Sequence, residues 1–153
     1  MGNILTEIFV KWQKAESRAA VTKSGATFQT CLELISEAVS GGTYKLHWYM
    51  EVERLGATNF DRSLRVRLGG VIIGQHVFTE DDTSVHAYAG WDIQTFGNRA
   101  TPVLDIQLQT AGGTPARTAR IQNIRLSLEL MEQEPGPRGL GQRQPGSGVG
   151  RGL

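Results

Sequence analysis

The amino-acid sequence predicts an all-β protein, an antiparallel jelly-roll β-sandwich of about eight strands with extended N- and C-terminal arms. Apolar and polar residues alternate with a period of two in many short segments, as they do when a strand buries one face. Glycine and asparagine turn signals separate these segments, and no long helical pattern interrupts them. Short strands between regular turns are typical of a sandwich or barrel, and about eight of them suit a two-sheet jelly roll.

Composition divides the chain into an N-terminal arm at residues 1–24, a jelly-roll β domain at residues 25–132, and a Gly/Pro/Arg-rich C-terminal tail at residues 133–153. Within the arm, the apolar residues between 4 and 12 fit both helical and strand spacing. Periodicity alone does not decide a run this short, so helix and strand both stay open there. In either conformation, we expect the segment to be buried against its own domain or a neighbouring subunit.

The first strands of the domain are expected at residues 27–39 and 44–52, joined by a turn at Gly41 and Gly42. Glycine favours such a turn because it accepts positive φ angles. The alternation in residues 44–52 is unbroken and places five residues inward: Tyr44, Leu46, Trp48, Met50 and Val52. The intervening residues, among them Lys45, His47 and Tyr49, are expected on the opposite face.

Further strands are expected at residues 64–68, 71–73 and 85–95. In the last of these, the more apolar set faces inward by the same logic, and Gly90 is a plausible position for a bulge. The inward set includes Trp91, so Trp48 and Trp91 are both predicted to pack in the core. His47 and His86 fall on predicted solvent-facing positions.

The final strands are expected at residues 104–109 and 119–130. Ala119 and Ile121 lie at odd-numbered positions, whereas the apolar residues from Ile124 to Leu130 lie at even-numbered positions. A strand with an unbroken register would turn one of these sets to water. The sequence therefore predicts a β-bulge or bend at Gln122 and Asn123.

The C-terminal tail is dominated by glycine, proline and arginine and contains few large apolar residues. Such a segment buries too little surface to offset its ordering entropy, so alone it is expected to be disordered or extended. Its glycine spacing fails at Gln142, which argues against a collagen triple helix. With its arginines, the tail suits an arm laid along an acidic neighbouring surface.

Composition argues against several classes of protein. The formal net charge of +1 argues against a dedicated nucleic-acid binder. The N-terminus lacks the features of a secretory signal, and no apolar run is long enough to span a bilayer. We therefore expect neither a membrane partner nor a specific nucleic acid. Cys31 is the single cysteine, so no intramolecular disulfide forms.

No motif points to catalysis or to a bound cofactor. The three histidines match no zinc-site spacing, and the acidic residues 80–82 lack the ligand pattern of a calcium loop, which favours a solvated turn. Cys31 is expected to be a core or half-buried strand cysteine. Because nucleophile elbows and phosphate-binding loops are also absent, we expect a protein that is not an enzyme, with no catalytic residues, metal ligands or cofactor.

The order of segments from residue 41 to residue 131 resembles the jelly-roll virion structural proteins of tailed bacteriophages, which include head decoration (cement) and fibre-type proteins. The resemblance lies in the Gly-Gly-Thr-Tyr entry at residues 41–44, the alternations at residues 64–68 and 102–109, and the final strand at residues 119–130. It implies a domain that trimerises on the capsid exterior and reaches neighbouring subunits with its terminal arms.

The leading hypothesis is therefore a capsid decoration protein, assembled in the host cytoplasm, that forms a homotrimer and binds the major capsid protein across capsomers. Its candidate assembly contacts are the arm residues Ile8, Phe9, Trp12, Arg138, Leu140, Arg143 and Arg151. The alternative is a tail-fibre or receptor-binding module for a host glycan or protein, with contacts from Tyr49, Tyr88 and residues 80–82. A cupin-like metalloenzyme is a third possibility, but no His and Glu spacing supports it.

Overall fold

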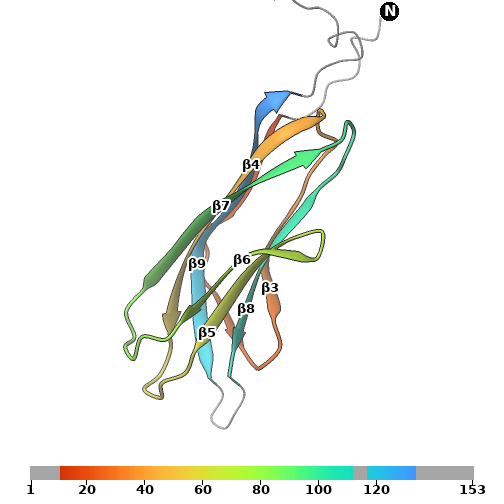
Figure 1. Cartoon of the computed structure of the whole chain (residues 1–153). Helices are drawn as coiled ribbons and strands as arrows, with labels where there is room; N and C mark the ends of the chain where they lie inside the picture. The colour runs from red at the N-terminus through yellow and green to blue at the C-terminus, as the bar shows by residue number, and fades with distance from the viewer. Residues whose placement is uncertain (1–10, 112–116, 134–153) are drawn as a thin grey trace, which may run out of the picture.

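The computed structural model describes residues 11–111 and 117–133, which form nine strands and no helix (Figure 1). This confirms the predicted all-β sandwich. The strands are β1 (Trp12–Ser17), β2 (Val21–Ser24), β3 (Gln29–Ile35), β4 (Gly42–Arg54), β5 (Arg62–Leu68), β6 (Val71–Phe78), β7 (His86–Phe96), β8 (Val103–Thr110) and β9 (Thr118–Gln133).

The strands form two antiparallel sheets that pack face to face. One sheet has the order β1-β9-β4-β7, with β2 also paired to β9, and the other has the order β3-β8-β5-β6. Both sheets interleave strands that are distant in the sequence, as expected for a jelly roll. Strands β6 and β7 are the edges at one side of the sandwich, where the rings of His76 and Tyr88 stack with centroids 5.0 Å apart. We call this the open side.

Strand β4 lies in the middle of the five-stranded sheet and follows the predicted alternation. Its inward residues, including Tyr44 and Trp48, are buried and contact the inward residues of both sheets. The shared core is completed mainly by leucine, isoleucine and valine residues of β5, β8 and β9. The prediction for Trp48 is therefore confirmed.

Strand β9 contains the predicted bulge. Opposite β4, Tyr49 pairs with Arg125 but Glu51 pairs with Gln122, so β9 carries one extra residue at this point. Asn123 has a φ of 49°, in the left-handed region that asparagine tolerates better than most residues. The extra residue turns the apolar side chains on both sides of the bulge toward the core, so the isoleucines on either side of it are both buried.

Strand β7 does not follow the prediction. Its register with β4 is continuous, with Trp91 opposite His47 and Gly90 opposite Trp48, so no bulge forms at Gly90. Residues opposite each other in a ladder share a face. Trp91 therefore faces outward with His47 and is 61% exposed, and its predicted place in the core is wrong. His86, predicted to face solvent, lies half-buried on the inward face.

Strands β1 and β2 lie within residues 1–24, the segment that composition assigned to an arm. Both strands pair with β9, so residues 12–24 contribute to the five-stranded sheet. Trp12 begins β1 opposite Glu129, and the conformation at this residue is a strand. The rest of the helix-or-strand question concerns residues that, like the C-terminal tail from residue 134, lie outside the described part of the chain.

Candidate functional site

The interior of the open side is built around Trp48. This side chain is 4% exposed and lies between Gly74 of β6 and Gly90 of β7. A Cβ atom at Gly90 would lie 2.6 Å from Trp48 Nε1, and one at Gly74 would overlap the other end of the indole. Glycine is required at both positions because another group approaches the backbone so closely. Trp48 Nε1 has no hydrogen-bond partner among the described residues.

The exterior of the open side is apolar along both edge strands. Six large hydrophobic side chains are exposed on or beside these strands, and we call them together the β6–β7 edge surface: Val71, Ile72, Val77, Val85, Trp91 and Ile93. Strand pairing puts Trp91 and Ile93 on the outer face of the five-stranded sheet, and Ile72 and Val77 on the outer face of the four-stranded sheet. Soluble proteins usually protect an edge strand with charges, proline or a covering segment, because its free backbone groups pair readily with another strand. Aliphatic residues on two long edges are instead typical of a contact surface.

The opposite side of the sandwich, formed by β1, β2 and β3, is joined by hydrogen bonds. The Glu37 backbone N–H donates to Gln13 Oε1 at 2.9 Å, which links β1 to the segment after β3. Gln29 Nε2 donates to the carbonyl oxygen of Ser24 at 2.6 Å, which links β3 to β2. We call this the closed side. One large aliphatic residue, Ile35 at the end of β3, is exposed there.

The acidic loop at residues 80–82 neutralises two buried arginines. Arg62 is fully buried and its Nη1 donates to the carbonyl oxygens of Phe60 and Glu80, at 2.9 and 3.1 Å. Arg62 Nη2 lies 3.5 Å from a Glu80 carboxylate oxygen, and Arg54 Nη1 lies 3.3 Å from Asp81. Burial lowers the pKa of Arg62 because it disfavours the charged form. The loop is exposed, as predicted, and its carboxylates also pair with buried arginines.

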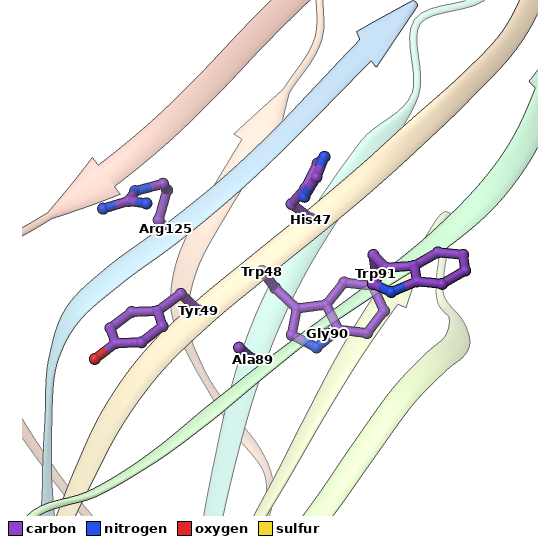
Figure 2. A pocket seen from close by; sticks show the side chains of 7 residues that line it. All are labelled: His47, Trp48, Tyr49, Ala89, Gly90, Trp91 and Arg125. Carbon is purple, nitrogen blue, oxygen red and sulfur yellow. The ribbon is translucent and has the colours of Figure 1, made fainter. Parts of the chain in front are cut away.

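A shallow hollow lies on the outer face of the five-stranded sheet and has a volume of about 310 Å³. Figure 2 shows Tyr49 and Trp91 on opposite sides of Ala89, with the Trp48 indole at Gly90 between them. Ala89 has a short side chain and Gly90 has none, so the floor of the hollow is low. The lining residues are His47, Trp48, Tyr49, Ala89, Gly90, Trp91 and Arg125. They come from neighbouring strands, since β4 lies between β7 and β9.

The rim of the hollow carries polar groups that remain accessible. Arg125 Nε donates to Glu16 at 3.3 Å, and the arginine side chain is largely exposed. His47 lies outward as predicted, with Nε2 3.8 Å from a Glu129 carboxylate oxygen. Lys45 Nζ lies 5.0 Å from the Trp91 ring centroid, a cation–π contact that orients the indole.

A second hollow of about 290 Å³ adjoins the first and shares Tyr49 and Arg125 with it. Glu51 is its most strongly bonded group, because it accepts hydrogen bonds from Tyr49 Oη at 2.6 Å, from Asn123 at 2.8 Å and from Gln122 at 3.3 Å. These bonds stabilise the carboxylate and lower the pKa of Glu51, and the bond to Glu51 raises the pKa of Tyr49. The phenol is therefore held in a fixed orientation beside both hollows.

The remaining candidate groups show no catalytic arrangement. Cys31 is half-buried, as predicted, and burial raises the pKa of its thiol to about 11, so the reactive thiolate is disfavoured. Nε2 of His86 contacts Asp82 at 2.8 Å. Within the described ranges, no group of three or more histidine, cysteine or acidic residues is arranged to hold a metal ion. The same ranges contain no helix long and apolar enough to cross a membrane.

Of the predicted assembly contacts, Trp12 alone lies in the described part of the chain, where it is exposed at the start of β1. The other six residues lie outside it, so the arm contacts stay a prediction: Ile8, Phe9, Arg138, Leu140, Arg143 and Arg151. Of the contacts predicted for a receptor-binding module, Tyr49 lines the hollow, whereas Tyr88 stacks inward on His76. The sequence reasoning missed Trp91, although its outward position follows from pairing with His47.

No family model matches the chain, and no curated protein matches its sequence. Among solved structures, it is similar to the EclA C-terminal domain, described as a sugar-binding protein, with a TM-score of 0.51, 12% identity, and coverage of 82% of this chain and 86% of that one. It is also similar to a chain of infectious bursal disease virus, Gt strain, with a TM-score of 0.52, 6% identity, and coverage of 91% and 38%. At these identities the similarities show the fold alone.

Proposed function

We propose that the protein is a phage virion structural protein, a capsid decoration protein that forms a homotrimer and stabilises the head shell from outside. The exposed aliphatic residues of β6 carry this proposal. Val71 is 67% exposed on β6, which is an edge strand of its sheet among the described residues. An isolated copy would leave this surface in water, where it favours aggregation. A specific partner copy removes the same surface from water and gains the free energy of apolar burial.

The fold is suited to this role. A heterologous contact, in which the apolar β6 edge of one copy meets a different surface of the next copy, would generate a closed ring when the rotation closes. Three copies related in this way would present three sets of terminal arms to the shell. The similarity in fold to a viral chain supports the proposal by analogy.

Binding across capsomers would stabilise the shell by mass action, because the decoration protein binds the assembled state and not the separated capsomers. The partner in this proposal is the major capsid protein, and the location is the capsid exterior. No catalysis is assigned to the protein.

Native mass spectrometry of the full chain, alone and with purified empty capsids, tests the proposal. We expect the mass of three 16.7 kDa chains and stoichiometric, high-copy binding to capsids. The double variant Val71→Ser, Val77→Ser should dissociate to monomers and lose capsid binding. The control is Ile35→Ser, which removes an equally exposed aliphatic side chain from the closed side and should leave the trimer intact. A monomeric wild-type chain, or capsids that bind only a few copies, would contradict the proposal.

A further inference from the structure

We infer that the hollow between Tyr49 and Trp91 is a carbohydrate-binding site that accepts a pyranose ring of a surface glycan. The site lies on the outer face of the five-stranded sheet, so it is separate from the aliphatic residues of β6 that carry the proposed trimer contact. It adds a ligand to the proposed structural role and does not depend on it.

Two aromatic side chains form the walls of the hollow. Trp91 is the most exposed aromatic side chain of the described chain, although burying a tryptophan is strongly favourable. A pyranose ring has one face of C–H groups, and these carry partial positive charge. The face of an aromatic ring is its negative region and therefore attracts such a C–H face. Tyr49 offers a second aromatic surface on the other side of Ala89 (Figure 2).

The rim of the hollow is polar. Sugar hydroxyls both donate and accept hydrogen bonds, so a sugar site needs donors and acceptors beside an aromatic surface. Arg125 presents guanidinium N–H groups, since its Nε alone is bonded to Glu16 among the described residues. His47 adds an imidazole at the same rim. The Tyr49 hydroxyl donates a hydrogen bond to Glu51, and its oxygen can still accept one from a sugar hydroxyl. Tyr49 is held in place by that bond, so little ordering entropy is lost on binding.

The shape of the hollow also favours a sugar ring. Its volume of about 310 Å³ is at the small end of the range for ligand pockets, and it opens onto a flat sheet face. A ring that is one unit of a longer chain can rest there while its neighbours continue over the second hollow, beside Glu51 and Asn123. A second protein copy fits less well, because the core of a protein interface is normally filled and depleted of charge.

The test is an NMR titration of the ¹⁵N-labelled full chain with the methyl glycosides of glucose, galactose, mannose, fucose and N-acetylglucosamine. We expect at least one glycoside to bind with saturable, millimolar affinity and to shift the amides of β4 and β7 around Tyr49, Ala89 and Trp91. Trp91→Ala should weaken binding by about tenfold, the effect of losing one aromatic stacking contact. Ile93→Ala, a neighbouring exposed residue outside the hollow, should bind as the wild type does.

Two further measurements separate this inference from the proposed function. The double variant Val71→Ser, Val77→Ser should still bind the glycoside, whatever its native mass. Trp91→Ala should keep the native mass of the wild type. The inference is overturned if no glycoside binds, if Trp91→Ala binds as tightly as the wild type, or if Trp91→Ala changes the native mass, which would assign this face to a second copy of the chain.

Discussion

The two sides of the sandwich treat their edge strands in opposite ways. On the closed side, glutamine side chains connect β1 to the segment after β3, and β3 to β2. On the open side, β6, β7 and the residue before β7 expose six of the nine large hydrophobic side chains that are exposed in the described chain. Since both sides belong to one fold and share one core, the difference does not come from the fold itself. It supports the proposal that the open side meets a partner copy.

The exposed residues of the open side do not result from loose packing beneath them. Trp48 fills the space between Gly74 and Gly90 so closely that neither glycine leaves room for a Cβ atom. The open side therefore combines a tightly packed interior with an apolar exterior.

The largest contrast is expected between two tryptophans on neighbouring strands. Trp48→Ala should reduce the free energy of unfolding by about 3–5 kcal/mol, because it leaves a cavity in the core. Trp91→Ala should reduce it by less than about 0.5 kcal/mol, because Trp91 packs on the surface. Denaturant unfolding of both variants measures the difference. Similar losses for the two variants would contradict the outward position of Trp91.

The next largest effect is expected at the glycine that faces Trp48. Gly90→Ala should destabilise the protein by about 1–3 kcal/mol, because its methyl group would overlap the indole. Gly97→Ala is the matched control, since nothing lies within 4 Å of its added Cβ atom. Thermal unfolding of the two variants gives the comparison. An unchanged midpoint for Gly90→Ala would mean that β6 and β7 can separate to accommodate the methyl group, and that the interior of the open side is loose.

A smaller effect is expected on the closed side. Gln13→Ala removes the acceptor for the Glu37 N–H and should cost about 0.5–1 kcal/mol, the net contribution of one neutral hydrogen bond. Hydrogen exchange should then increase at the Glu37 amide and stay unchanged in β6 and β7. If exchange rose equally on both sides of the sandwich, the closed side would not be a separate stabilising unit.

The smallest effect is expected from acid. The hydrogen bonds of Asp82 with His86 and with the Ser84 N–H lower the pKa of Asp82 in the folded state. The stabilisation is complete above the ordinary carboxyl pKa of 3.8 and is lost as the pH falls through the lower, folded-state value. Asp82→Asn should therefore be less stable than the wild type at neutral pH and should approach it in strong acid. A difference that did not depend on pH would exclude the charge of Asp82 as its origin.

The sequence predicted the strands whose two faces differ strongly in polarity. From Tyr44 to Val52 the inward residues of β4 are all large and apolar, and in β9 the change of parity at Asn123 required a bulge. Strand β7 misled the same reasoning, because its outward residues include Trp91 and Ile93 whereas its inward residues include Asp92 and Gln94. An edge strand buries little of either face, so the polarity of its residues does not indicate which face points inward. The pairing with β4 decides the orientation.

The hollow could not be predicted either, because it also depends on how the strands pair. It needs Tyr49, Trp91 and Arg125 on one face, and three strands distant in the sequence bring them together. Tyr49 was singled out as a possible contact, but its partners were not. Once the register with β4 is known, β7 is seen to carry its large apolar residues on the outward face. This reversal identifies the face that bears the hollow.

Hydrogen–deuterium exchange of the native assembly tests the central claim, that the open side meets a partner copy. Backbone amides of β6 and β7 should exchange more slowly in the wild-type assembly than in the Val71→Ser, Val77→Ser variant, whereas amides of β3 should exchange equally in both. Equal exchange of β6 and β7 in the two proteins, or slower exchange of β3 alone, would contradict the claim.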